Sequence, residues 1–314
     1  LIKPNILSAT DGSFSRASSG SYTNSTGGIN TVSNDVPRFH YINGEFKGLL
    51  YESAITNNIP SSEVIVASTG TTVNSNTELA PDGTTTADEL VETTDNSEHF
   101  SQDFTYVFST ATTYTWSAFV KRPTGLNRRV ALRTTQGYAI FDFTSESFVL
   151  ISGITNLGFE KLGNSYYRIW IVASSAVSTY FRIQLANTSN ELSYTGSTSE
   201  KIIVWGKQME IHDWVSSYIK TSGSAMSRAA DVIVGSGFIY SNATNADADY
   251  SSGSTYALAA RVTYSGSIWE SLQNTNLNHQ PDTSPTWWVL VGPDNKHAAL
   301  DSSVSTVSSS TGEL

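Results

Sequence analysis

The sequence predicts an all-β protein whose main part is a jelly-roll β-sandwich. Apolar side chains occupy every second position in TTYTWSAFV (112–120) and in FRIQLA (181–186), and a period of two is typical of half-buried strands. Similar runs recur along the chain, separated by Gly, Asn or Ser-Thr clusters at spacings that suit sandwich strands and turns. Long helical periodicity is missing, so two sheets packed face to face account for the pattern.

Composition divides the chain into five segments. The first is rich in Gly and Ser and has only short apolar marks, so we expect an extended head that wraps rather than folds alone. The stretch YSNATNADADYSSGS (240–254) consists of small and acidic residues and favours a linker. The expected segments are the head 1–56, the sandwich 57–234, the linker 235–249, a small β module 250–292, and a tail or further domain 293–314.

Charge argues against several classes of partner. The chain has 18 Lys and Arg against 28 Asp and Glu, a net charge of −10, and no basic cluster. Nucleic acid and anionic membrane are therefore poor partners. No apolar run approaches the roughly 18 residues that a membrane span needs, and LIKPNILSATDG at the start lacks a signal-peptide pattern. We expect neither nucleic-acid binding nor membrane insertion.

Catalytic motifs are missing from the sequence. Cysteine is absent, which excludes disulfides and cysteine-based metal or redox sites. The patterns G-x-S-x-G, H-E-x-x-H and the phosphate loop are absent as well. Carboxylate pairs that cleave glycosides meet in space and not in sequence, so that chemistry stays open. We assign no catalytic residue and no cofactor, and we expect this chain to be non-enzymatic. We also expect it to be a piece of a longer protein that continues beyond Leu314.

Metal-binding patterns are weak. Asn245, Asp247 and Asp249 alternate as in a calcium loop, but Tyr250 stands where the loop needs glycine and Tyr256 where it needs a bidentate glutamate. No residue of the sequence therefore uniquely indicates a structural calcium site. None of the five histidines has a partner at the spacing of metal ligands, and we expect all five to be ordinary surface or turn residues. These histidines are His40, His99, His212, His279 and His297.

Three tryptophans stand in the otherwise polar stretch GSIWESLQNTNLNHQPDTSPTWW (266–288). A module of roughly 40 residues without disulfide or metal needs large aromatic side chains to build a core. Adjacent residues on a strand point to opposite faces, so Trp287 and Trp288 cannot fill one core. We expect Trp269 and one of the pair in the core and the other on the surface; which one faces outward stays open.

An outward indole or phenol ring can stack on the apolar C–H face of a sugar, while nearby Asn, Gln and Asp bind its hydroxyls. Tyrosines of the same module could extend such a platform, although each also suits a half-buried strand position. The candidate carbohydrate-binding residues are Tyr256, Tyr264, Trp269, Trp287 and Trp288. In the sandwich, the strand patterns around Trp116, Trp170 and Trp205 predict core residues.

The first 234 residues resemble a known family. FSRASSGSYTNSTGGINTVSNDVPRFHY followed by GEFKGLLYESAITN resembles a segment at the start of many bacteriophage tail-fibre, tailspike and related virion proteins. APDGTTTADELVE, TTYTWSAFVK, LGNSYYRIWI, IIVWGKQME, SSYIKTSG and SRAADV continue the likeness in the expected order. The resemblance implies concanavalin-like, carbohydrate-binding jelly rolls, and it makes Trp214 a closing residue of the last strand. Tyr51 and Glu52 stand where the family usually has an aliphatic residue and then Glu. The matching marks in the head are Arg16 and Ala17, Tyr22, Pro37 to Phe39 and Gly48 to Leu50.

The last module is similar to the small chitinase-type carbohydrate-binding module that phage tail proteins reuse. One departure is Ala259, where the module normally has glycine, so the turn there is expected to be looser or to use another geometry. Another is the missing aromatic residue near His297. The residues at characteristic places are Tyr256, Val262, Tyr264, Gly266, Trp269, Pro285, Trp287 and Trp288.

These resemblances imply a structural virion protein of a phage tail that is made in the host cytoplasm and attaches to a host surface glycan. Its other partners would be phage tail proteins, and the family suggests a homotrimer. One alternative is a set of accessory modules of a glycan depolymerase whose catalytic domain follows Leu314. A second is an architectural spacer or capsid decoration that binds no sugar, which needs no exposed aromatic platform.

Overall fold

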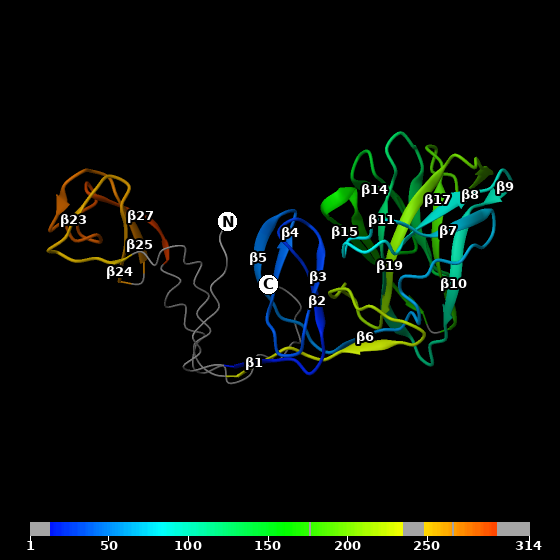
Figure 1. The fold of residues 1–314 in the computed structure, drawn as a ribbon, viewed down its shortest axis with the longest axis horizontal. Helices are drawn as coiled ribbons and strands as arrows, with labels where there is room; N and C mark the ends of the chain where they lie inside the picture. The colour runs from blue at the N-terminus through cyan, green and yellow to red at the C-terminus, as the bar shows by residue number, and fades with distance from the viewer. Residues whose placement is uncertain (1–12, 176, 235–247, 266, 294–314) are drawn as a thin grey trace. The chain divides into compact units, whose positions relative to one another are not determined.

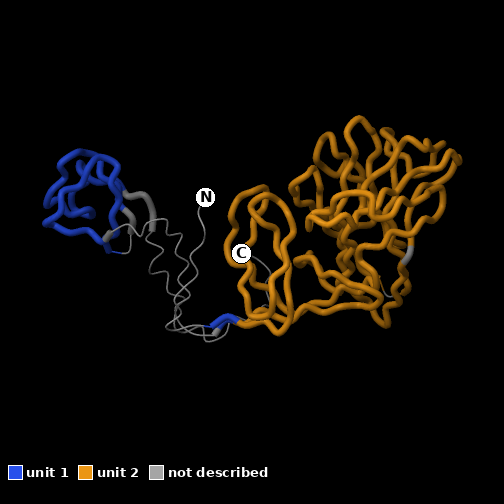
Figure 2. The backbone as a smooth tube through the Cα atoms, in the orientation of Figure 1, with its two compact units in different colours: residues 1–14, 233–308 blue, residues 15–232, 309–314 orange. Residues whose placement is uncertain are grey.

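The computed structural model describes residues 13–175, 177–234, 248–265 and 267–293. Within these ranges the regular structure is β-strand apart from one short 3-10 turn, Gly163–Ser165, which confirms the all-β prediction. Residues 15–232 form one compact unit, and the described residues of 233–293 belong to a second (Figures 1 and 2). No helix in these ranges is long and apolar enough to cross a membrane.

Two antiparallel sheets form the sandwich in the larger unit. The first sheet has the strand order β15-β16-β11-β19-β8-β7 and the second β10-β17-β12-β13-β14. The strands of the first are β7 (Thr71–Glu78), β8 (Ala87–Glu92), β11 (Thr112–Lys121), β15 (Asn156–Lys161), β16 (Tyr167–Ser175) and β19 (Lys201–Glu210). Those of the second are β10 (Phe100–Tyr106), β12 (Arg129–Arg133), β13 (Tyr138–Asp142), β14 (Ser147–Ser152) and β17 (Thr179–Ala186).

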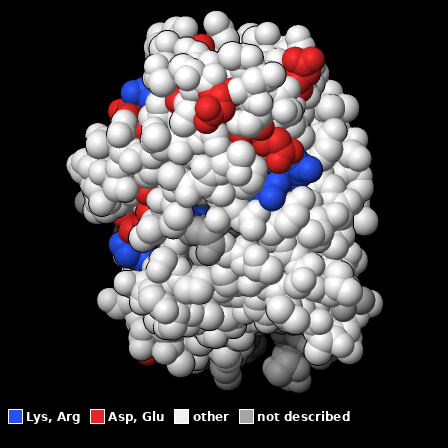
Figure 3. Space-filling model, turned by 90° about the vertical axis from the view of Figure 1, so that its right-hand side faces the viewer, with Lys and Arg blue, Asp and Glu red and all other residues white. Residues whose placement is uncertain are grey.

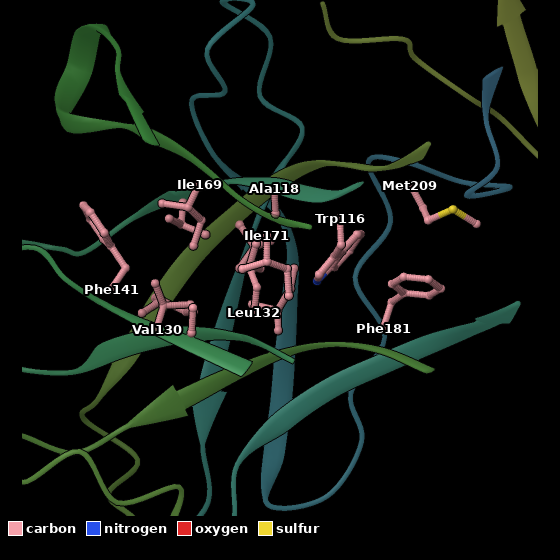
Figure 4. Close-up of a cluster of buried hydrophobic side chains, with 14 of the residues drawn as sticks. Trp116, Ala118, Val130, Leu132, Phe141, Ile169, Ile171, Phe181 and Met209 are labelled. Atoms are coloured by element: carbon pink, nitrogen blue, oxygen red, sulfur yellow. The ribbon is translucent and has the colours of Figure 1, made fainter. Parts of the chain in front are cut away.

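The main core lies between these two sheets. Alternate residues of β11 point into it, and Trp116 meets Phe181 of β17 with ring centroids 5.4 Å apart (Figure 4). Leu132 and Ile171 are fully buried in the same cluster. Burial of each such side chain is worth about 2 kcal/mol, which is why the period-two runs specify these strands.

A second apolar cluster covers the other face of the six-stranded sheet. Phe119 alternates with Trp116 along β11 and packs against Trp205 and Tyr218, with ring centroids 5.2 and 5.6 Å away. Ile29, from the segment expected to form an extended head, belongs to this cluster. The head therefore supplies part of a core.

Short strands build the head and the remaining sheets. The described part of the head consists mainly of the hairpins β2–β3 and β4–β5. The pairs involved are β1 (Ser13–Ser15) with β21 (Val232–Val234), β2 (Gly20–Thr23) with β3 (Ile29–Val32), β4 (Arg38–Ile42) with β5 (Glu45–Leu50), β6 (Ile55–Asn57) with β20 (Met226–Arg228), and β9 (Asn96–Glu98) with β18 (Ser193–Thr195).

A buried ion network ties the head to the chain segment that follows the sandwich. Arg38 contacts Glu52 at 2.7 Å and Asp231 at 2.6 Å, and Arg16 contacts Asp231 at 3.2 Å. Arg228 lies 3.4 Å from Glu52. Burial acts to raise the pKa of Glu52, but Arg228 and Arg38 outweigh it and hold that pKa below its ordinary value. The network joins stretches that are far apart in the sequence.

Two sequence-based expectations in the larger unit are wrong. Trp170, expected in the core, is half-buried because it alternates with Ile169 and Ile171, which take the core side of β16. Its indole lies across Gly158 of the neighbouring strand. His99, expected at the surface, is fully buried, and its ring nitrogens lie 2.7 Å from the Gly70 carbonyl oxygen and 3.1 Å from that of Tyr194. Trp116 and Trp205 are core residues, as predicted.

The smaller unit is a four-stranded sheet with a two-stranded addition. The sheet order is β22-β24-β25-β27, and β23 pairs with β26. Only β22 and β24 run parallel among these pairs. The strands are β22 (Ala248–Asp249), β23 (Thr255–Tyr256), β24 (Arg261–Tyr264), β25 (Ser267–Ser271), β26 (Asn276–Leu277) and β27 (Trp288–Pro293).

Candidate functional site

The adjacent tryptophans of the smaller unit have different surroundings. Trp288, at the start of β27, is 2% exposed and donates its indole N–H to the His279 carbonyl oxygen at 2.6 Å. Trp287 is half-buried. The pair divides between core and surface, and the structure makes Trp287 the outward member.

One face of the Trp287 indole is covered by the imidazole ring of His279. The rings of His279 and Trp287 are stacked, with centroids 3.8 Å apart and planes at 10°. Asn276 is fully buried, and its side-chain oxygen lies 3.1 Å from Nδ1 of His279. The Asn276 amide also donates to the Trp287 carbonyl oxygen at 3.2 Å and to the Ser271 hydroxyl at 2.9 Å. These contacts fix the orientation of the indole plane.

The tyrosines of the site gather around Trp288. Tyr256 meets the Trp288 ring edge-on at 5.2 Å and is stacked with Tyr250 at 5.9 Å. Tyr250 also meets Tyr264 edge-on at 5.5 Å. Burial, with Tyr256 and Tyr264 adding to it, raises the pKa of Tyr250, so its phenol stays neutral at pH 7. Tyr256 and Tyr264 are half-buried.

Trp269 departs from its expected place in the core. It lies on β25 and is half-buried, and its indole N–H donates to the Tyr264 carbonyl oxygen at 3.3 Å. The structure thus brings Tyr256, Tyr264 and Trp288 into one aromatic cluster through Tyr250, and it places Trp287 on His279.

Sequence analysis missed Tyr250 and His279 as partners of the candidate residues. The sequence patterns mark Tyr250 only as a misfit in a calcium loop and His279 only as an ordinary surface or turn residue. The signal that could have found His279 is its place in the polar loop that leads into the two tryptophans. A stacked pair eight residues apart depends on how that loop folds back, and local periodicity does not show it.

Polar side chains are frequent in the stretch 272–286 that precedes Trp287. Gln273 donates to the Thr286 carbonyl oxygen at 2.9 Å, and Gln280 donates to Asp282 at 2.8 Å. All three side chains are at the surface. Amide and carboxylate groups next to an indole can bind the hydroxyl groups of a sugar that stacks on the ring.

The described residues contain no group of three or more His, Asp or Glu that could hold a metal ion. Of the weak calcium pattern, Asn245 and Asp247 lie outside the described residues, as do Gly266 of the module and His297 of the last segment. Asp249 accepts a hydrogen bond of 2.5 Å from the Thr263 hydroxyl.

Comparisons with known proteins give no family for this chain. No family model matches it, and no curated protein does. Solved structures give weak similarities of fold. The xylan-binding domain of Paenibacillus barcinonensis Xyn10C matches with a TM-score of 0.31 and 9% identity over 53% of this chain and 100% of that one.

Two multi-modular structures match over about half of this chain. The module pair of Clostridium thermocellum endo-1,4-β-D-xylanase 10B, complexed with xylohexaose, has a TM-score of 0.29 and 12% identity over 54% of this chain and 30% of that one. A Podospora anserina β-(1,4)-mannanase with a carbohydrate-binding module has a TM-score of 0.27 and 12% identity over 52% and 28%. None of the three is a phage tail protein, and similarities at this level carry no functional conclusion.

Proposed function

We propose that this chain is a non-enzymatic glycan-binding protein and that Trp287 is the stacking surface of its smaller unit. The observation that carries the proposal is the half-buried Trp287 indole, on which the His279 ring stacks at 3.8 Å. The imidazole occupies one face of the indole, so we assign the other face to a sugar ring. Trp288, the neighbouring indole, is buried and serves the core.

The chemistry of a sugar matches these surroundings. A pyranose ring has apolar C–H faces that gain dispersion and hydrophobic contact on an aromatic plane. Its hydroxyls need donors and acceptors, and the surface side chains of Gln273, Gln280 and Asp282, in the stretch that precedes Trp287, can supply them. An indole whose plane is already fixed loses little conformational entropy when a ligand stacks on it.

The test is a tryptophan fluorescence titration of the whole chain with chitin oligomers and with bacterial surface polysaccharides. We expect a saturable change in emission that Trp287→Ala abolishes while the circular dichroism stays that of the parent. Trp288→Ala should instead unfold the smaller unit, because removing a buried indole costs about 3–5 kcal/mol.

Trp214 supplies the matched control, since it is another half-buried indole but lies in the larger unit beside His212. Trp214→Ala should leave the titration unchanged. Binding that survives in a folded Trp287→Ala variant, or a parent chain that no glycan perturbs, would overturn the proposal in favour of an architectural spacer.

We propose further that the chain is a structural virion protein of a phage tail, assembled as a homotrimer that binds other tail proteins and a host surface glycan. Support comes from the resemblance that runs through the head, the sandwich and the small module. Arg16 and Arg38 lie in the first stretch that carries it and Asp231 lies in the last, and these side chains meet in the buried ion network.

Immunogold labelling of phage particles with antibodies against this chain tests the virion role, and light scattering after gel filtration tests the trimer. We expect labelled tails and three times the mass of one chain. Unlabelled particles together with a monomeric chain would contradict this assignment. Release of new reducing ends from a bound polysaccharide would contradict the non-enzymatic role.

A further inference from the structure

The outward face of the five-stranded sheet carries an unusual pair of arginines. Arg133 of β12 lies directly opposite Arg182 of β17, and Tyr138 of β13 lies opposite Arg133 on the other side. Like charges in direct cross-strand register destabilise a sheet. The chain has a net charge of −10, so two adjacent positive charges are unusual in it. Their mutual repulsion has to be offset by a counter-ion or retained for a function.

One carboxylate serves both arginines. Glu98 accepts from Arg133 at 2.6 Å and from Arg182 at 3.3 Å. The remaining acceptors are neutral amides, because Gln184 accepts from Arg133 at 3.1 Å and Gln102 accepts from Arg182 at 2.6 Å. Among these five side chains the charges sum to one positive. We call this group the arginine patch.

Aromatic rings hold one of the two guanidinium groups flat. The guanidinium carbon of Arg182 lies 3.8 Å from the centroid of Phe100 and 4.2 Å from that of Tyr180. Cation–π contact with two rings restrains its orientation. The Arg182 side chain is 18% exposed and that of Arg133 is 24% exposed, so both groups reach solvent.

Arg133 does not use all of its hydrogen-bond donors in direct bonds to the protein. The hydrogen bonds that Arg133 makes to described residues all leave from Nη1. No direct hydrogen bond from its Nε or Nη2, which form one side of the planar fork, reaches a described residue, although the Tyr180 hydroxyl lies close enough to interact with the guanidinium group. Such a pair of parallel N–H groups matches the two oxygens of a carboxylate.

We propose that the arginine patch binds the carboxylate of an acidic sugar, such as a uronic or sialic acid unit in a glycan. The fork of Arg133 takes the carboxylate, and half-buried Tyr138, next in the same row, offers a contact for the sugar ring. Charged side chains are sparse on the side of the sandwich that Figure 3 shows, and a local excess of one positive charge can discriminate acidic from neutral sugars.

This site goes beyond the proposed role of Trp287. The arginine patch lies in the larger unit, on another sheet. Its proposed ligand carries a negative carboxylate, which chitin oligomers lack. Binding of acidic sugar can therefore fail while chitin binding succeeds, or the reverse.

The experiment is a calorimetric titration of the whole chain with oligogalacturonate and with sialyllactose, which separate the two sources of the carboxylate. Methyl-esterified oligogalacturonate and lactose are the neutral counterparts. We expect at least one acidic probe to bind, its neutral counterpart to bind about tenfold more weakly or not at all, and added salt to weaken the interaction.

Arg133→Gln should reduce the affinity for the acidic probe by about tenfold or more and leave any chitin titration unchanged. Arg261→Gln is the control, because it removes the same charge from an exposed ion pair with Glu270 in the smaller unit. Arg133→Lys keeps the charge and removes the fork, so it tests the site even where Arg133→Gln does not fold. Equal binding of acidic and neutral probes, no binding of either acidic probe, or full affinity in a folded Arg133 variant would overturn the proposal.

Discussion

At the scale of single residues, the smaller unit keeps a backbone geometry that its side chain disfavours. Ala259, which stands where the resembling modules have glycine, has φ of 65°. Its amide donates to the Ser271 carbonyl oxygen at 2.8 Å, and the Ser271 amide donates to Ala260 at 2.8 Å. The turn therefore retains a left-handed residue, a geometry that glycine adopts without strain, and it stays joined to β25.

Ala259→Gly should stabilise the smaller unit. A left-handed conformation costs an L-residue about 1–2 kcal/mol, and glycine removes this strain. The glycine variant also has a more flexible unfolded chain, which lowers its stability by up to about 1 kcal/mol. We expect a net increase of about 0.5–1 kcal/mol in the free energy of unfolding, measured by denaturant titration of tryptophan emission. Ala257→Gly is the control, because Ala257 is exposed and is not among the residues with positive φ; this change should be destabilising. Equal effects of the two changes would refute the strain argument.

At the scale of elements, β11 and β19 explain how one sheet can be buried on both faces. Their pairing shifts register between Ser117 and Phe119, opposite the stretch from Trp205 to Gln208. Gly206 lies in that stretch with φ of 62°. A bulge of this kind re-aims the side chains that flank it, and it lets Phe119, Trp205 and Tyr218 pack under the head.

Gly206→Ala should be strongly destabilising. A Cβ at this position would lie 2.7 Å from the Phe119 ring, and the backbone penalty of a positive φ adds to that clash. We expect a loss of more than about 2 kcal/mol in the free energy of unfolding of the larger unit. Gly125→Ala isolates the backbone part, since Gly125 has φ of 86° and nothing lies within 4 Å of an added Cβ. The steric argument fails should both variants lose the same stability in chemical denaturation.

At the scale of the whole molecule, the larger unit is closed by contacts between its first and last described segments. Asp231 accepts from Arg16 and Arg38 and from the amide of Glu52 at 2.9 Å. One aspartate thus connects three parts of the head to the end of the unit. The smaller unit has its own buried residues, among them Val262 and Trp288.

Asp231→Ala should loosen the head. Removing one member of a buried ion network leaves the others charged and unpaired, which costs about 3–5 kcal/mol. We expect lower stability of the larger unit and faster proteolysis within residues 15–57. Asp213→Ala is the matched control, because the contact of Asp213 with His212 at 3.1 Å is largely exposed and contributes little. An Asp231→Ala chain with parent-like stability and proteolysis would show that the head is held by apolar packing alone.

The sequence by itself determined the all-β class, the sandwich, the split of the tryptophan pair and the core placement of Trp116 and Trp205. These follow from alternation along a strand, which is a local property. It did not predict that the head joins a core. Ile29 packs with residues more than fifty positions away, and Arg38 pairs with Asp231 at the far end of the unit; such pairings have no local signature.

The tertiary structure decided which side of each alternation faces inward. It placed Trp288 in the core and Trp287 on His279, turned Trp170 outward across Gly158, and buried His99. It also set Arg133 opposite Arg182 with one shared glutamate. The physical reason is that a period of two specifies that neighbours differ, whereas strand register and the covering layer determine which neighbour is buried and which charges meet.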